Sequence, residues 1–202
     1  MKQPALSILT SLLTMVAMVP TAKAAPSVTP AQSQIPPPVT AIASLDVPKY
    51  MGPWYQVAWF PNRFQKQCVS DTTATYRQLP DGNVEVLNRC KTADGKFDSV
   101  LGVARPKGSR LEGQSLKPAQ LEVSFLPAAL RWLPFWGNYW VLSLADDGRY
   151  AVVSESTRQY LWVLSRTPSL SAADETAIRS LLTPLGYELD RWQAHTHSGP
   201  AR

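Results

Sequence analysis

The sequence predicts an all-β domain in which eight antiparallel strands are followed by one helix. Eight short runs are rich in β-branched and aromatic residues, and turn residues separate them. No strand–helix–strand alternation indicates a parallel sheet, so the runs suit an antiparallel barrel or sandwich. The expected strands are 54–60, 70–78, 83–90, 97–105, 121–125, 139–144, 150–154 and 160–165.

The first strand begins at Trp54, after a stretch that no long helix can cross. Pro48 and Pro53 each fix φ and lack an N–H, so they stop a helix from running through 45–60. Gly52 permits a tight turn directly before the strand.

Two Asp-Gly pairs predict hairpins, one at Asp81-Gly82 and one at Asp147-Gly148. A three-residue turn over 80–82, with Gly82 in the left-handed region, would pair Tyr76 with Val86 and Ala74 with Asn88. Residues 106–120 are rich in Pro, Gly, Ser and Lys and are expected to form a loop.

One helix is expected near the end of the chain. Ser171 and Asp174 form a capping-box pattern, and an apolar stripe at helical spacing follows. We expect this stripe to pack on the outside of the sheet, with residues 187–192 adding a short ninth strand. The stripe comprises Ala177, Ile178, Leu181, Leu182 and Leu185.

Residues 1–24 have the pattern of a cleaved secretory signal peptide. Lys2 precedes an apolar run over 5–19, and Ala22-Lys23-Ala24 matches a cleavage site. A membrane anchor is the alternative, but the run is shorter than the ~20 apolar residues of a membrane span. No cysteine follows the run before Cys68, so we expect no lipobox and a periplasmic or secreted product. Residues 25–44 contain five prolines and no charge, which predicts a disordered leader.

The charge and the motifs exclude several classes of function. Removing Lys2 and Lys23 with the signal lowers the net charge from +5 to +3, which is too mild for a nucleic-acid-binding face. The only histidines, His195 and His197, lie in a tail (195–202) that we expect to be disordered. No catalytic motif is present, so the sequence predicts neither an enzyme nor a metal or cofactor site.

Five motifs resemble the lipocalin family. Gly52-Pro53-Trp54 opens the first strand, and four longer segments follow in order at 60–66, 73–76, 135–140 and 160–168. They resemble bacterial lipocalins of the Blc type, which are relatives of apolipoprotein D. The resemblance runs from residue 45 to about residue 192 and so covers the expected lipocalin domain, 45–194.

This resemblance implies an eight-stranded antiparallel up-and-down barrel (lipocalin) with one C-terminal α-helix packed outside. Such a barrel has no free edges, and its interior can hold one small ligand. By similarity, Trp54 closes one end and Arg166 stacks against it, which is a structural role.

Cys68 and Cys90 make an even count in an exported protein, which favours a disulfide. The strand before residue 70 must then fold back to bring Cys68 to Cys90. The alternative is a free thiol that could act as a nucleophile.

Alternation along the strands selects the side chains expected to point inward. Small residues among aromatics suggest space for an elongated apolar ligand, although a barrel filled by its own side chains is the alternative. The predicted ligand-binding residues are Ala58, Phe60, Ala74, Tyr76, Val86, Asn88, Gly102, Val123, Phe125, Tyr139, Val141 and Trp162.

The expected function is therefore binding, with storage or transport, of a fatty acid or lysophospholipid in the bacterial cell envelope. The alternatives are a lipid- or isoprenoid-modifying enzyme on the same barrel and an envelope interaction protein. The apolar segment 126–137 joins two strands at the barrel mouth. It would fold inward as a lid, contact a membrane, or pack on a neighbouring loop. The oligomeric state is left open.

Overall fold

The computed structural model describes residues 35–199. The expected signal peptide, residues 25–34 of the leader and residues 200–202 lie outside this range. Within 35–199, no helix is long and apolar enough to cross a bilayer.

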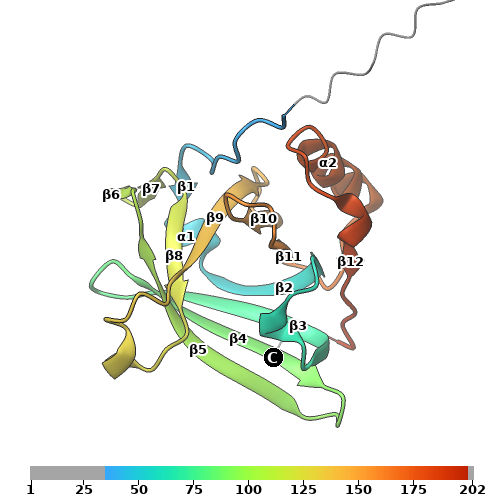
Figure 1. Ribbon diagram of the computed structural model, residues 1–202, viewed down its shortest axis with the longest axis horizontal. Helices are drawn as coiled ribbons and strands as arrows, with labels where there is room; N and C mark the ends of the chain where they lie inside the picture. Colours follow the sequence, from blue (N-terminus) through green and yellow to red (C-terminus); the bar gives the residue numbers. More distant parts are fainter. Residues whose placement is uncertain (1–34, 200–202) are drawn as a thin grey trace, which may run out of the picture. The chain divides into compact units, whose positions relative to one another are not determined.

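Eight antiparallel strands close into a barrel, as predicted (Figure 1). The first and last strands of the set, β2 and β11, pair with each other, so every strand has two neighbours. In order around the wall the strands are β2 (Gly52–Trp59), β3 (Cys68–Gln78), β4 (Val84–Thr92), β5 (Phe97–Pro106), β8 (Gln120–Ser124), β9 (Gly137–Leu144), β10 (Tyr150–Ser154) and β11 (Leu161–Ser165).

The hairpin of β3 and β4 has the predicted register. Tyr76 pairs with Val86 and Ala74 with Asn88. Gly82 has φ +82°, a left-handed conformation that a residue with a Cβ rarely adopts. The length and conformation of this turn therefore decide which side chains of β3 and β4 point into the barrel.

Short elements cover the closed end of the barrel. β1 (Leu45–Asp46) pairs with β7 (Ser115–Lys117), which pairs with β6 (Arg110–Glu112). The segment 106–120 is thus a hairpin rather than the predicted loop. A single helical turn, α1 (Val47–Tyr50), forms despite Pro48, because proline is tolerated in a first turn where no N–H is needed. The Asp46 carboxylate accepts a hydrogen bond from the Lys49 N–H at 3.1 Å and caps this turn.

The helix α2 (Ala172–Leu182) packs outside the barrel, as predicted. The Ser171 hydroxyl caps it by accepting a hydrogen bond from the Asp174 N–H at 3.1 Å. Ile178 and Leu182 are buried against outward-facing residues of the wall, including Val152 and Val163. The apolar stripe thereby covers the outer face of β10, β11 and β2.

The predicted ninth strand over 187–192 is wrong. Leu189–Arg191 forms one 3₁₀ turn, and the extra strand is β12 (Gln193–Ala194), which pairs with Trp59 and Ala58 of β2. β3 pairs with β2 only as far as Tyr55 and Thr73, so β12 takes the free edge of β2 beyond that point.

Ordered chain also begins earlier than expected. Val39 is buried in the cluster beneath α2. The Ile42 N–H donates to the Val141 carbonyl at 2.9 Å, and the Ile42 carbonyl accepts from the Ala119 N–H at 3.0 Å. Residues 35–44 therefore belong to the folded unit, because their backbone groups and one side chain find partners on the wall.

Candidate functional site

The barrel interior collects most of the residues predicted to bind a ligand. Ala74, Tyr76, Val86 and Val141 are buried in the interior cluster, and Val123, Tyr139 and Trp162 pack against it. Asn88 and Gly102 lie opposite inward-facing Ala74 and Val86, so they share that face.

Phe125 covers Gly102 near the end of β8. A Cβ added at Gly102 would lie 2.6 Å from Cδ1 of the Phe125 ring and 2.9 Å from the Ser124 carbonyl. Glycine at this position therefore lets the aromatic ring pack directly on the backbone of β5.

Ala58 and Phe60 do not line the interior, and this part of the prediction is wrong. A bulge at Val57 is the cause: Val163 of β11 pairs with Ala58, whereas the next residue, Leu164, pairs with Gln56. One extra residue reverses the facing of all that follow. Ala58 and Phe60 are consequently buried in the outer cluster beneath α2.

The same bulge turns Trp59 inward, which the alternation pattern missed. Trp59 pairs directly with Trp162 of β11, and Trp162 packs against the interior cluster. Trp59 also contacts His195 edge to face, with ring centroids 6.1 Å apart. No signal in the sequence marks the bulge, since both faces of β2 are buried.

The closed end is held by Trp54 and Arg166. Trp54 is fully buried, and its indole N–H donates to the Tyr50 carbonyl at 2.8 Å. The Arg166 guanidinium lies 3.6 Å from the centre of the indole ring. Arg166 also donates to the carbonyls of Pro53, Lys49 and Met51 at 2.6–2.9 Å, which ties β11 to α1.

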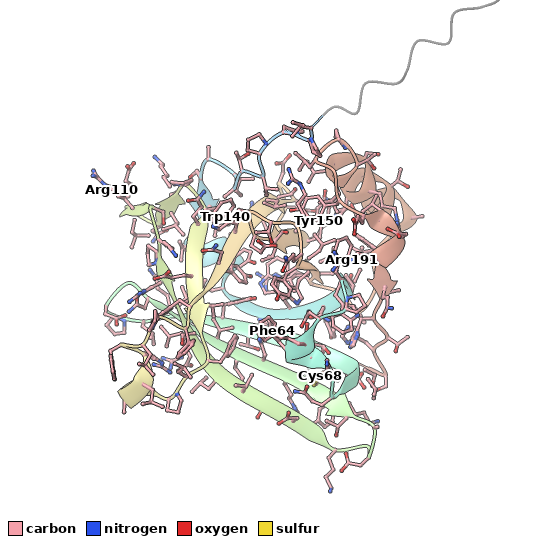
Figure 2. The ribbon with its side chains drawn as sticks, in the orientation of Figure 1. Phe64, Cys68, Arg110, Trp140, Tyr150 and Arg191 are labelled. Carbon is pink, nitrogen blue, oxygen red and sulfur yellow. A yellow bond between two sulfur atoms is a disulfide. The ribbon has the colours of Figure 1, made fainter. Side chains whose placement is uncertain are left out.

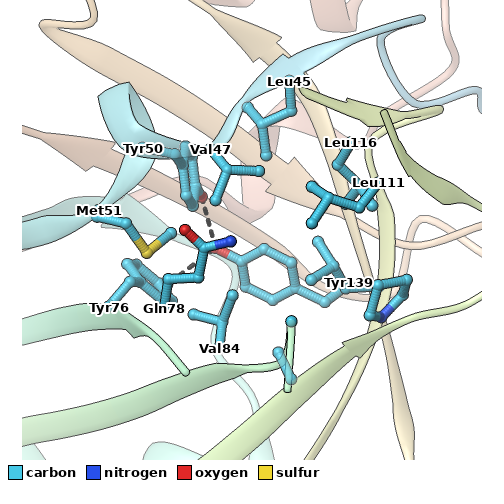
Figure 3. A pocket seen from close by; sticks show the side chains of 14 residues that line it. Leu45, Val47, Tyr50, Met51, Tyr76, Gln78, Val84, Leu111, Leu116 and Tyr139 are labelled. Atoms are coloured by element: carbon cyan, nitrogen blue, oxygen red, sulfur yellow. Dashed lines mark hydrogen bonds between the residues drawn. The ribbon is translucent and has the colours of Figure 1, made fainter. Parts of the chain in front are cut away.

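Above this floor, three tyrosine hydroxyls form a hydrogen-bonded chain (Figure 3). The Tyr139 hydroxyl lies 2.6 Å from that of Tyr50 and 2.8 Å from that of Tyr76. Burial raises the pKa of Tyr76 to about 12 and raises the pKa values of Tyr50 and Tyr139 well above the usual range. All three therefore remain neutral. Two bonds use two of the three hydroxyl protons, so one proton stays available as a donor.

A hollow of about 30 Å³ adjoins the tyrosines. Apolar side chains from the closed-end elements and from the wall surround it, including Leu45, Val47, Met51, Val84 and Leu116. A hollow of this size has room for water but not for an acyl chain. A larger ligand would have to displace side chains.

The C-terminal segment fills the split between β2 and β3 instead of forming a solvated tail. The His195 N–H donates to the Val57 carbonyl at 2.9 Å, and His195 Nε2 accepts from the Thr72 N–H at 3.2 Å. The Asp71 carboxylate accepts from the Ser198 N–H at 2.6 Å and from the Ser198 hydroxyl at 2.9 Å. The expectation of a disordered tail from residue 195 is therefore wrong over 195–199.

This segment is expected to loosen in acid. Burial, and after it the nearby His197, lowers the pKa of His195. Just below pH ~6.5, the unfolded chain therefore binds more protons than the folded chain. Stability consequently falls as the pH falls through this range. Burial acts to raise the pKa of Asp71, but bonds from Ser198 and Ser70 outweigh it and lower that pKa. The contribution of Asp71 to stability is therefore lost only at lower pH, as the pH falls through its folded-state pKa.

Amide hydrogen exchange measures this effect. Protection factors of His195 and Thr72 should fall between pH ~7.5 and ~5, while those of the β4–β5 hairpin stay constant. His195→Gln keeps an acceptor that does not titrate and should remove most of the change. Equal protection at both pH values in the original protein would contradict the assignment.

The mouth carries the two cysteines, the apolar loop 126–137 and the polar loop 60–68. Cys68 and Cys90 form the predicted disulfide, with Cα atoms 5.5 Å apart, and register shifts between Cys68 and Thr73 bring Cys68 opposite Thr92, close to Cys90. Figure 2 labels Cys68 and Phe64 at this end of β3. Neither cysteine therefore offers a free thiol. Within residues 35–199, no group of His, Cys, Asp or Glu is placed to hold a metal ion.

The apolar loop 126–137 presents its side chains to solvent. Trp132 is 79% exposed and Phe135 66% exposed. The base of the loop is fixed: the Trp136 indole N–H donates to the Arg131 carbonyl at 3.1 Å, and the Arg105 guanidinium lies 3.8 Å from the centre of the Trp136 indole. The loop therefore neither folds inward as a lid nor packs its apolar side chains on a neighbouring loop.

Comparison with known proteins points to one family. A family model described as a lipocalin-like domain matches residues 45–197. Temperature-induced lipocalin-1 of Arabidopsis thaliana is 34% identical over 150 residues, covering 74% of this chain and 78% of that protein. Outer membrane lipoprotein Blc of Escherichia coli K12 is 33% identical over 177 residues, covering 87% and 93%. Apolipoprotein D of Mus musculus is 32% identical over 163 residues, covering 77% of each.

Solved structures show the same fold at lower identity. The allergen Per a 4 from cockroaches superposes with a TM-score of 0.59 at 18% identity, covering 79% of this chain and 92% of that one. Insecticyanin from the tobacco hornworm Manduca sexta also gives 0.59, at 16% identity, covering 81% and 87%.

Proposed function

The chain belongs to the lipocalin family, and from this premise we propose that it binds a fatty acid or lysophospholipid inside its barrel. Members of this family bind small hydrophobic ligands. The observation that carries the proposal is the uncharged lining above the closed end, which runs from Val86 past Val141 to Trp162 and Phe125. Storage or transport in the cell envelope is the role that fits such a site.

The affinity would come from burial of the acyl chain, which contributes about 0.8 kcal/mol per methylene. The hollow beside the tyrosines holds only about 30 Å³, so an acyl chain that reached this depth would have to displace side chains. Phe125 is partly exposed and lies over Gly102, so we propose that its ring rotates toward solvent when a ligand enters.

Loop 126–137 supplies a route of entry from a membrane surface. Trp132 and Phe135 protrude from a loop whose base is fixed, and an indole suits the headgroup level of a bilayer. Across the mouth, the 60–68 loop exposes Phe64 beside Arg63 and Lys66, which would attract anionic headgroups. We therefore propose that both loops touch the lipid surface during loading.

Transfer of a fluorescent fatty acid or lysophospholipid from anionic vesicles tests both proposals. The protein should take up the probe, and the double variant Trp132→Ser/Leu133→Ser should do so several-fold more slowly with an almost unchanged melting temperature. Leu181→Ser removes an exposed apolar side chain on α2 and serves as the matched control. It should load at the original rate.

The two proposals fail separately. If the double variant and the control load equally fast, the loop has no part in loading. If the original protein binds neither probe from vesicles or from solution, the binding function is excluded. That result would favour an interaction protein with a filled barrel, the alternative that the small hollow supports.

A further inference from the structure

We propose that Gln56 and Thr72 form a polar anchor inside the barrel that binds the hydrogen-bond-accepting group of the ligand, a carboxylate or an ester carbonyl. This inference rests on the proposed lipid-binding function and specifies which end of the amphiphile the barrel recognises. Two buried polar atoms without partners carry it: Gln56 Nε2 and Thr72 Oγ1.

Both residues occupy interior positions in the middle of the wall. Gln56 pairs with Leu164, a member of the interior cluster, and precedes the bulge at Val57. Thr72 lies two residues before inward-facing Ala74, so the alternation counted back from Ala74 faces Thr72 inward. It follows Asp71, whose φ of +54° falls within the register shift between Ser70 and Thr73. Tyr55 and Thr73 are the last paired residues of β2 and β3, so Gln56 and Thr72 take the next position on each strand. Each residue is only 4% exposed.

A chain of amides fixes the orientation of Gln56. The Trp162 indole nitrogen can only donate, and it donates to Gln65 Oε1 at 2.8 Å. Gln65 must therefore turn its amide nitrogen toward Gln56, where Nε2 donates to Gln56 Oε1 at 2.8 Å. Gln56 accepts this bond with its oxygen, and its own amide nitrogen is left facing elsewhere. Rotating either amide would set donor against donor or acceptor against acceptor.

Thr72 is held in place by a contact that leaves its hydroxyl unused. Its backbone N–H donates to His195 Nε2, which joins β3 to the C-terminal segment. Its hydroxyl has no partner among the described residues. Buried polar groups in folded proteins are nearly always paired, so two orphans that flank the split between β2 and β3 need an explanation.

The chemistry of the two groups selects the ligand. An amide nitrogen only donates, and a hydroxyl can donate, so an acceptor group on the ligand that reached both would satisfy them. Carboxylate and carbonyl oxygens meet that requirement, whereas a hydrocarbon does not. An amphiphile would then insert with its polar group at mid-depth, and the neutral tyrosine chain below it adds one further donor.

Competition against a bound fluorescent dye tests the anchor with three probes of equal chain length: palmitic acid, methyl palmitate and hexadecane. The original protein should bind both carbonyl-bearing probes about tenfold more tightly than hexadecane, the ratio expected when unpaired buried donors gain an acceptor. Gln56→Leu and Thr72→Val should each bring this ratio toward one while leaving hexadecane affinity nearly unchanged.

Two further variants test whether the loss of preference comes from the missing donor. Gln56→Glu keeps the acceptor for Gln65 but removes the donor, so it should weaken palmitic acid most and hexadecane least, whether or not Gln56→Leu folds. Gln114→Leu alters an exposed glutamine at the closed end and should preserve the ratio.

The anchor and the binding function fail in different ways. Equal affinity of the original protein for all three probes overturns the anchor and leaves lipid binding intact. A ratio that survives in both Gln56→Leu and Gln56→Glu does the same. If no probe binds, the proposed function and the anchor are both excluded.

Discussion

Replacing Trp54 with alanine is expected to lower the free energy of unfolding by about 3–5 kcal/mol, the usual cost of truncating a large buried aromatic side chain. Trp54 is fully buried, and its ring packs between the Arg166 guanidinium and the Tyr50 ring, whose centroid is 5.3 Å away. Truncation leaves a void under both neighbours and removes the bond to the Tyr50 carbonyl. Urea unfolding followed by circular dichroism measures the loss.

Trp132→Ala is the matched control, because it removes the same side chain from an exposed loop. Its effect on the free energy of unfolding should stay within about 0.5 kcal/mol. Trp54 lies at the closed end, so lipid affinity of the folded Trp54→Ala protein should change little. Equal stability of the two variants would contradict the placement of Trp54.

The register of the β3–β4 hairpin could be predicted from the sequence because the residues of its turn determine it. Only a residue without a Cβ adopts the φ of Gly82 at low cost, and the length of that turn sets the register of both strands. The inward positions of Tyr76 and Val86 followed directly. The disulfide was predicted from the even cysteine count of an exported protein rather than from the register, because a regular register places Cys90 opposite Thr72 and not near Cys68.

β2 was not predictable beyond Gln56, because its two faces are equally apolar. The inner face packs in the barrel and the outer face lies beneath α2, so alternation of polar and apolar residues disappears. A bulge in such a strand leaves no trace in composition. The facing of Ala58, Trp59 and Phe60 is decided by the pairing with β11, which is a tertiary contact.

Parts of the candidate site depend on contacts between residues distant in the chain. The polar tail after residue 194 became a structural segment because the part of β3 before Thr73 does not pair with β2 and exposes backbone groups that need partners. The orphaned amide of Gln56 follows from its contact with Gln65 and from that of Gln65 with Trp162, 97 residues further along the chain. Neither arrangement has a local sequence signal.

Phe60→Ala and Trp59→Ala separate the two faces of β2. Phe60 is fully buried beneath α2, where its ring contacts Tyr187, at a centroid distance of 6.2 Å, and the Arg191 guanidinium at 4.7 Å. Its truncation should cost about 3–5 kcal/mol of unfolding free energy. Lipid affinity of the protein that remains folded should be unchanged, because no part of Phe60 faces the interior.

Trp59→Ala, unlike Phe60→Ala, should change the lipid affinity. Trp59 lies opposite Trp162 on the interior face, so its removal should change lipid affinity in the folded protein by several-fold. Urea unfolding and dye competition on the same samples report both quantities. Altered lipid affinity of the Phe60→Ala protein, together with normal affinity of the Trp59→Ala protein, would contradict the bulge at Val57. It would show that side chains alternate without interruption along β2.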